Sequence, residues 1–187
     1  MTSPGDDRVL IERIARGDRE ALKDIYGRHH MRIYRFLVRM TGNEGMAEDI
    51  MNEVFLAAWQ GASRYEGRSA PLTWLLSIAH NKAASRMRKR QAATALLDAA
   101  ADVADLADTP DIVAQKEDKG RLIRQCMDAL SSEHRTIVDL VYYQERSVAE
   151  AAEILGIPEG TVKTRMFHAR KKLSELLAAR GVDRGWP

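Results

Sequence analysis

Basic and polar side chains are concentrated in the run GTVKTRMFHARKKL, residues 160–173, which holds five Lys or Arg residues and no Asp or Glu. At about 100° per residue, one side of a helix through this run combines hydrogen-bond donors with one aromatic ring. That side carries Lys163, Thr164, Phe167, Lys171 and, beside them, His168. Donors around one apolar contact are what the reading of base edges in a DNA major groove requires. A solvated basic helix face is the alternative.

The opposite side of this helix is apolar and predicts contact with a core. It carries Val162, Met166, Ala169, Leu173 and Leu177. Three cations lie on the flanks between the two sides: Arg165, Arg170 and Lys172. Cations at the edges of a groove-reading surface contact phosphates and position the protein.

The residues before this run predict a shorter helix and a tight turn. Ser147 followed by Glu150 is a capping-box pattern, and apolar residues recur at helical spacing after it, at Val148, Ala151, Ala152 and Leu155. Gly156 ends that helix, and Pro158 suits the first turn of the next one. Two helices around a glycine turn form a helix-turn-helix, whose second helix enters the major groove.

The composition of the 187-residue chain is typical of an all-helical intracellular protein. The net charge is only +2, so the segregation of charge indicates nucleic-acid binding better than its total does. The single cysteine, Cys126, excludes an internal disulfide and lies in an apolar series that predicts burial. No apolar run reaches the roughly 20 residues of a membrane span. The N-terminal residues lack the apolar core of a signal peptide, which predicts a cytoplasmic location.

Start and stop residues divide the first half of the chain into helices. We expect a short helix before Gly17, a second from Asp18 to Gly42, a third from Asn43 to about Trp59 and, after a loop at 61–71, a fourth from Leu72 to about Arg90. The stretch 91–109 is rich in Ala and Asp and predicts a flexible acidic linker, partly helical. Helices at about 110–129 and 132–143 would support the helix-turn-helix. The predicted fold is all-α, with two small domains at 1–90 and 110–187.

Three stretches resemble a known family. LSSEHRTIVDLVYYQERSVAEAAEILGIPEGTVKTRMFHARKKL resembles region 4 of bacterial extracytoplasmic-function sigma factors, and AEDIMNEVFLAAW with PLTWLLSIAHNKAASRMRKR resembles their region 2. The resemblance implies that the chain binds core RNA polymerase, directs it to promoters and has no cofactor, metal or catalytic residue of its own. It also implies a role in a stress or envelope response. Two basic domains on a flexible tether predict, with the family's support, an anti-sigma factor as inhibitor.

The resemblance assigns residues to each partner. The −35 element would be read by Lys163, Thr164, Phe167 and His168, with phosphates held by Arg165, Arg170 and Lys171. The −10 element would be bound by Arg64, Tyr65, Arg68, Asn81, Lys82, Arg86 and Arg88, with His80 and Lys89 as further polar groups. Cations with aromatic rings are what a groove for unstacked single strands requires. Core polymerase would contact Asp49, Asn52 and Glu53, for which a solvated acidic helix face is the alternative. Relatives often carry Arg at the position of His168, a shorter and partly charged donor.

Two other classes of protein compete with this interpretation. A lone helix-turn-helix regulator would leave the N-terminal basic domain without a role, and no heptad seam for a dimer is evident. An enzyme could be imagined with His29, His30, Asp24 and Glu20 as metal ligands. Adjacent histidines on a helix point about 100° apart and cannot share a facial site. The sequence also contains no HExxH, phosphate-binding glycine loop or nucleophile motif.

Overall fold

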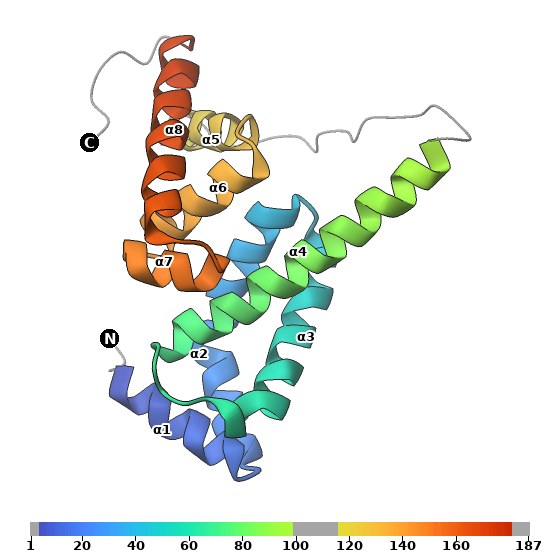
Figure 1. The fold of residues 1–187 in the computed structure, drawn as a ribbon, viewed down its shortest axis with the longest axis vertical. Helices are drawn as coiled ribbons and strands as arrows, with labels where there is room; N and C mark the ends of the chain where they lie inside the picture. The colour runs from blue at the N-terminus through green and yellow to red at the C-terminus, as the bar shows by residue number, and fades with distance from the viewer. Residues whose placement is uncertain (1–3, 99–115, 181–187) are drawn as a thin grey trace.

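The computed structural model describes the backbone of residues 4–98 and 116–180, and the side chains of residues 7–94 and 121–180. Every regular element in these ranges is a helix, which confirms the all-α prediction (Figure 1). The first half contains α1 (Pro4–Ala15), α2 (Arg19–Thr41), α3 (Glu44–Gly61), the short 3₁₀ turn η1 (Ala62–Arg64) and α4 (Pro71–Asp98). The second half contains α5 (Lys116–Asp128), α6 (Ser132–Val138), the π-helical turn η2 (Asp139–Tyr143), α7 (Val148–Leu155) and α8 (Glu159–Ala178).

The predicted helix boundaries in the first half follow from local caps. Asp18 accepts hydrogen bonds from the backbone N–H groups of Glu20 and Ala21, at 2.9 and 3.2 Å, and so starts α2. Gly42 ends α2 with a φ of 65°, a left-handed conformation that glycine adopts without steric cost. Asn43 then accepts a hydrogen bond from the Met46 N–H at 2.8 Å and starts α3. The predicted caps at these positions are confirmed.

Helices α1–α4 pack around buried apolar side chains from each of them. The largest fully buried ones are Ile11, Ile14, Ile25, Ile33, Phe36, Leu37, Ile50, Leu75 and Leu76. Helices α5–α8 pack in the same way around Cys126, Ile137, Leu140, Ile154, Val162 and Ala169. Burial of such side chains is the main stabilising contribution to a helical fold. Cys126 is completely buried, as its apolar series predicts.

Helix α4 differs from its predicted extent. It continues past Arg90 to Asp98, so residues 91–98 of the predicted linker are helical and extend from the body of the molecule (Figure 1). The reason is local, because the Ala, Leu and Gln residues of this stretch favour helix even where no core is buried. Residues 99–109 and the predicted helix start at Thr109-Pro110 lie outside the described residues.

The N-terminal helices α1–α4 and the C-terminal helices α5–α8 lie in contact. Helix α7 packs against α4, and α6 approaches α2 (Figure 1). The sequence predicts two domains on a tether and gives no sign of this contact. The segment that follows α6 is also irregular, since η2 is a wide π turn and Glu145 has a φ of 54°.

Candidate promoter and polymerase interface

The helix-turn-helix forms from the predicted signals. The Ser147 hydroxyl accepts a hydrogen bond from the Glu150 N–H at 3.2 Å, and a Glu150 carboxylate oxygen accepts one from the Ser147 N–H at 2.9 Å. This reciprocal pair is a complete capping box at the start of α7. Gly156, with a φ of 64°, ends α7. Pro158 is the N-cap residue of α8 and not, as predicted, a residue of its first turn.

The two sides of α8 are as the sequence predicts. Val162, Ala169 and Leu173 are buried, and Met166 and Leu177 are partly buried against the core. The predicted reading side is exposed along its length: Lys163, Thr164, Phe167, His168 and Lys171. Phe167 is 65% exposed, and its ring makes an edge contact with the neighbouring His168 ring, 5.4 Å between centroids. The helix thus presents an apolar contact among hydrogen-bonding groups.

The predicted phosphate contacts divide into two kinds. Arg170 and Lys171 are exposed on α8. Arg165 is partly buried and forms an ion pair with Glu133 of α6, with 3.2 Å between the Arg165 Nη2 and Glu133 Oε2 atoms. A DNA phosphate would therefore have to compete with the Glu133 carboxylate for Arg165, whereas Lys171 is exposed.

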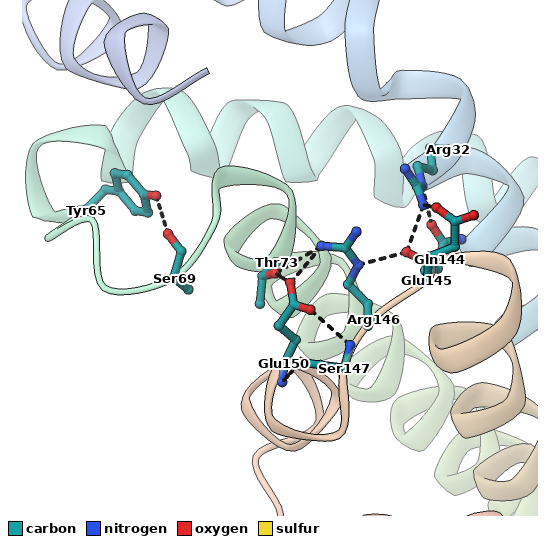
Figure 2. A network of polar contacts seen from close by, with 9 residues as sticks. All are labelled: Arg32, Tyr65, Ser69, Thr73, Gln144, Glu145, Arg146, Ser147 and Glu150. Atoms are coloured by element: carbon teal, nitrogen blue, oxygen red, sulfur yellow. Dashed lines mark hydrogen bonds and ion pairs between the residues drawn. The ribbon is translucent and has the colours of Figure 1, made fainter. Parts of the chain in front are cut away.

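The loop between α3 and α4 is shaped by Tyr65. Its hydroxyl donates to the backbone carbonyl of Ser69 across the loop (Figure 2), and its ring lies 5.0 Å from the Trp74 ring. Burial raises the pKa of Tyr65 above its ordinary value. Arg64 and Arg68 are exposed, and Arg68 pairs with Glu66 at 2.6 Å. In this arrangement Tyr65 holds the loop, while the two arginines face solvent.

Basic residues of α4 are paired with acidic residues of α3. Lys82 lies 3.2 Å from Glu53, and Arg86 lies 3.2 Å from both Asp49 and Glu53. The sequence assigns Lys82 and Arg86 to DNA and Asp49 and Glu53 to polymerase, whereas the structure brings the two groups together. The sequence does not predict this cluster, because the acidic residues of α3 and the basic residues of α4 lie far apart in the chain.

The remaining predicted contacts on these helices differ in exposure. Asn81 and Arg88 of α4 and Asn52 of α3 are exposed. His80 is partly buried, and its Nδ1 atom is buried with no hydrogen-bond partner among the described residues. Burial lowers the pKa of His80, so its ring is neutral near pH 7 and does not add to the cationic surface.

The histidine pair does not form a site with Asp24 and Glu20. His29 bonds through Nε2 to Asp7 of α1 at 2.8 Å, while His30 bonds through Nδ1 to the Tyr26 carbonyl at 2.9 Å and stacks on the Tyr26 ring. Glu20 pairs with Lys23. The two imidazoles thus serve separate packing contacts.

In the described ranges, no helix is both long and apolar enough to span a membrane.

Comparison with known proteins connects both halves of this arrangement to transcription. Residues 25–93 match the family model of Sigma-70 region 2, and residues 120–173 match that of Sigma-70 region 4. The first match runs from within α2 to within α4, and the second runs from α5 into α8 and includes the turn between α7 and α8. A lone helix-turn-helix regulator does not account for the first match.

Relatives extend the match over nearly the whole chain. The ECF RNA polymerase sigma factor SigK of Mycobacterium ulcerans is 34% identical over 192 aligned positions, which cover 96% of this chain and all of the relative. SigK of Mycobacterium bovis is 29% identical, covering 95% and 98%.

Two solved structures share the fold. The sigma factor RpoE of Bartonella quintana, in complex with the anti-sigma factor NepR, has a TM-score of 0.72 at 26% identity, covering 87% of this chain and 98% of that one. CnrH in complex with the cytosolic domain of CnrY has a TM-score of 0.68 at 25% identity, covering 93% and 98%. The chain belongs to the extracytoplasmic-function RNA polymerase sigma factors.

Proposed function

We propose that this sigma factor reads its promoters with α8 and α4, and that α8 supplies the −35 contacts. The observation that carries the proposal is the exposed side of α8, where Lys163, Phe167 and Lys171 project from a helix held by a capped partner helix and a glycine turn. A rigid helix with donors and one apolar contact fits the major groove. Lys163, Thr164, Phe167 and His168 would contact bases, and Arg165, Arg170 and Lys171 would contact phosphates.

The −10 element would be bound by the loop after η1 and by α4. Arg64, Arg68, Asn81 and Arg88 are exposed there, and Lys82 and Arg86 would join them when they leave their α3 partners. A positively charged track with one amide suits a displaced single strand. Tyr65 would keep the loop in shape, with Trp74 behind it.

Core polymerase would dock on the acidic side of α3 through the exposed Asp49 and Asn52 and the partly buried Glu53. Action with polymerase would put the protein in the cytoplasm, and in this proposal the chain has no catalytic step of its own. RpoE was solved with the anti-sigma factor NepR, and CnrH with the cytosolic domain of CnrY. We infer an anti-sigma factor here as well, released in a stress or envelope response.

Reconstituted transcription tests the proposal. Core polymerase with the purified chain should produce transcripts from a promoter of the matched family and none from a template with a scrambled −35 element. A triple variant, Asp49→Asn, Asn52→Ala and Glu53→Gln, should lose co-migration with core enzyme while keeping its helix content. No transcript at any chain concentration, with a relative's sigma factor active in parallel, would refute the proposal.

A further inference from the structure

Polar contacts join the C-terminal helices to the N-terminal helices at three points. Arg39 of α2 pairs with Asp139 at the start of η2, and Arg32 of α2 donates to Gln144, at 3.0 Å to its side-chain oxygen and 2.7 Å to its backbone carbonyl. The Thr73 hydroxyl of α4 donates to Glu150 of α7 at 2.8 Å (Figure 2). These contacts connect residues 77 to 112 positions apart in the chain.

The Arg39–Asp139 pair contains the most deeply buried charged group of the three contacts. Asp139 is only 1% exposed, and the Arg39 guanidinium also lies over the Tyr143 ring, 4.7 Å from its centroid. Within its own unit, Asp139 receives a longer hydrogen bond from the Gln144 amide at 3.4 Å. A buried carboxylate that loses its cation is strongly destabilised. The closed arrangement therefore depends on Arg39 as the cation beside the buried Asp139.

The third point, between Thr73 and Glu150, uses the capping box of the helix-turn-helix. One Glu150 oxygen caps α7 through the Ser147 N–H, and the other accepts from Thr73 and from Arg146, the latter at 2.7 Å. Thr73 is completely buried. Burial alone would raise the pKa of Glu150, but these hydrogen bonds and the Arg146 charge hold it below its ordinary value. The group that starts α7 thus also ties it to the first turn of α4.

The backbone between Asp139 and Glu150 is irregular. Asp139 and Tyr143 bound the π turn η2. Glu145 has a φ of 54°, a left-handed backbone conformation that is unfavourable for residues other than glycine. Arg146 bonds through its Nε atom to the Gln144 carbonyl at 2.7 Å and holds the turn. The irregular stretch therefore coincides with the residues that reach the N-terminal helices.

This closed arrangement does not fit a promoter. Elements at −10 and −35 are about 25 base pairs apart, or about 85 Å at 3.4 Å per base pair. Asn81 lies about 12 Å along α4 from Thr73. Through the Thr73–Glu150 contact, α7 and the turn, Lys163 can be at most about 50 Å from Asn81. A cavity of about 310 Å³ between the units is moreover lined by both Arg88 and Arg165, assigned to different promoter elements.

We propose that the chain inhibits itself through this latch, defined as the contacts of Arg39 with Asp139, Arg32 with Gln144, and Thr73 with Glu150. The latch holds the free chain closed without a partner, and it must open before both promoter elements are engaged. Its inhibitory consequence rests on the proposed reading of −10 by α4 and −35 by α8. A partner that covers both units would then stabilise a state that the chain already forms.

A distance measurement on the free chain tests the latch. Spin labels at Glu48→Cys on α3 and Ser174→Cys on α8, both exposed, report the separation of the units. The wild-type sequence should give one short, narrow distance. Arg39→Ala should lower the ratio of closed to open chains by roughly 100-fold, as expected when a buried carboxylate loses its cation. Arg35→Ala is the matched control, because Arg35 is exposed on the same helix and forms no hydrogen bond or ion pair with the described residues.

A second variant separates opening from unfolding. Thr73→Val nearly keeps the shape of a buried side chain but replaces the hydroxyl that donates to Glu150 with a methyl group, so it should open the chain by a smaller factor with unchanged helix content. If Arg39→Ala loses helix content, Thr73→Val decides the question. A broad, long distance in the wild type, or the wild-type distance in both variants, would overturn the latch.

Transcription assays then separate the latch from the proposed function. At limiting sigma concentration, Arg39→Ala should give several-fold more transcript than wild type or Arg35→Ala. Absence of transcript from every form, with the distances as expected, would reject the proposed function and leave the latch standing. An opened Arg39→Ala chain with unchanged transcript yield would show that the latch does not inhibit.

Discussion

The basic side chains of α8 and those of α4 are held in different ways. On α8, Lys163 and Lys171 are exposed beside Phe167, so the surface is formed before any DNA arrives. On α4, Lys82 and Arg86 are engaged with Glu53 and Asp49 of α3. Under the proposed function, a double-stranded −35 element would meet a preformed surface on α8, whereas the α4 cations proposed for a displaced strand would first have to leave their α3 partners. The free energy needed to separate an ion pair increases with how deeply the pair is buried.

The buried pair at the junction of the units has the largest expected effect, and it is visible as a pH dependence. Burial raises the pKa of Asp139 to about 6, against the charge of Arg39 and the hydrogen bonds from Arg39 and Gln144, from an ordinary value of 3.8. The folded chain therefore holds a proton that the unfolded chain has released. The resulting stability is complete below pH 3.8 and is lost as the pH rises through about 6.

Urea unfolding at several pH values measures this contribution. Relative to Asp139→Asn, the wild-type free energy of unfolding should fall by up to about 3 kcal/mol between pH 4 and pH 6. The comparison with Asn cancels carboxylates of opposite behaviour, such as Asp18, whose pKa is lowered by hydrogen bonds from Ala21 and Arg13. Parallel curves for the two proteins would contradict the assignment of a raised pKa to Asp139.

Replacement of Phe167 tests whether the exposed side of α8 reads the −35 element. Phe167→Ala should change the base preference at the −35 element by roughly 1–3 kcal/mol at the contacted position, because one apolar base contact is lost. Binding to a library of −35 variants measures the preference. Ser174→Ala, exposed farther along the same helix, is the control. A preference profile identical to wild type would remove Phe167 from the reading surface.

Lys171 offers a smaller and different effect. Lys171→Ala should weaken −35 binding evenly across sequences and reduce the slope of log affinity against log salt by about 1, since one phosphate contact is lost. Lys23→Ala on α2 removes the same charge far from α8 and should leave the slope unchanged. A loss confined to one base pair would instead make Lys171 a base-reading residue.

The weakest effect is expected at the α3–α4 cluster. Glu53→Gln removes the carboxylate shared by Lys82 and Arg86, and should strengthen binding of single-stranded DNA to the free chain by no more than about fivefold, because exposed pairs contribute at most about 1 kcal/mol. Glu48→Gln, exposed on the same helix, is the control. Equal affinity of wild type and Glu53→Gln would mean that α4 is as available for DNA as α8.

The sequence predicts those features whose cause is local. The Asp18 and Asn43 caps, the capping box of Ser147 and Glu150, and the exposed side of α8 each arise from residues within a few positions or one helical period. The predicted end of α4 at about Arg90 is wrong, because no stop residue such as Gly156 is present there and the end depends on helix propensity alone. The role of Pro158 was misplaced by one position for the same lack of a sharp local signal.

Contacts between distant residues were not predicted. Lys82 and Glu53, or Arg39 and Asp139, lie 29 and 100 positions apart, and no periodicity links them. Their pairing follows only from how α3 meets α4 and how α2 meets η2. One signal was present in hindsight, since Asp139 stands in the apolar series of residues 136–141, where a carboxylate needs a cation from elsewhere.

Mapping of transcript start sites tests whether the chain directs polymerase to promoters with two sequence elements. Core polymerase on genomic DNA, with and without the chain, should gain a set of start sites that share two sequence elements, at about −10 and about −35. The Phe167→Ala chain should shift only the −35 element of that set. Start sites that are the same with and without the chain, or that share no upstream elements, would contradict the account of a two-element promoter reader.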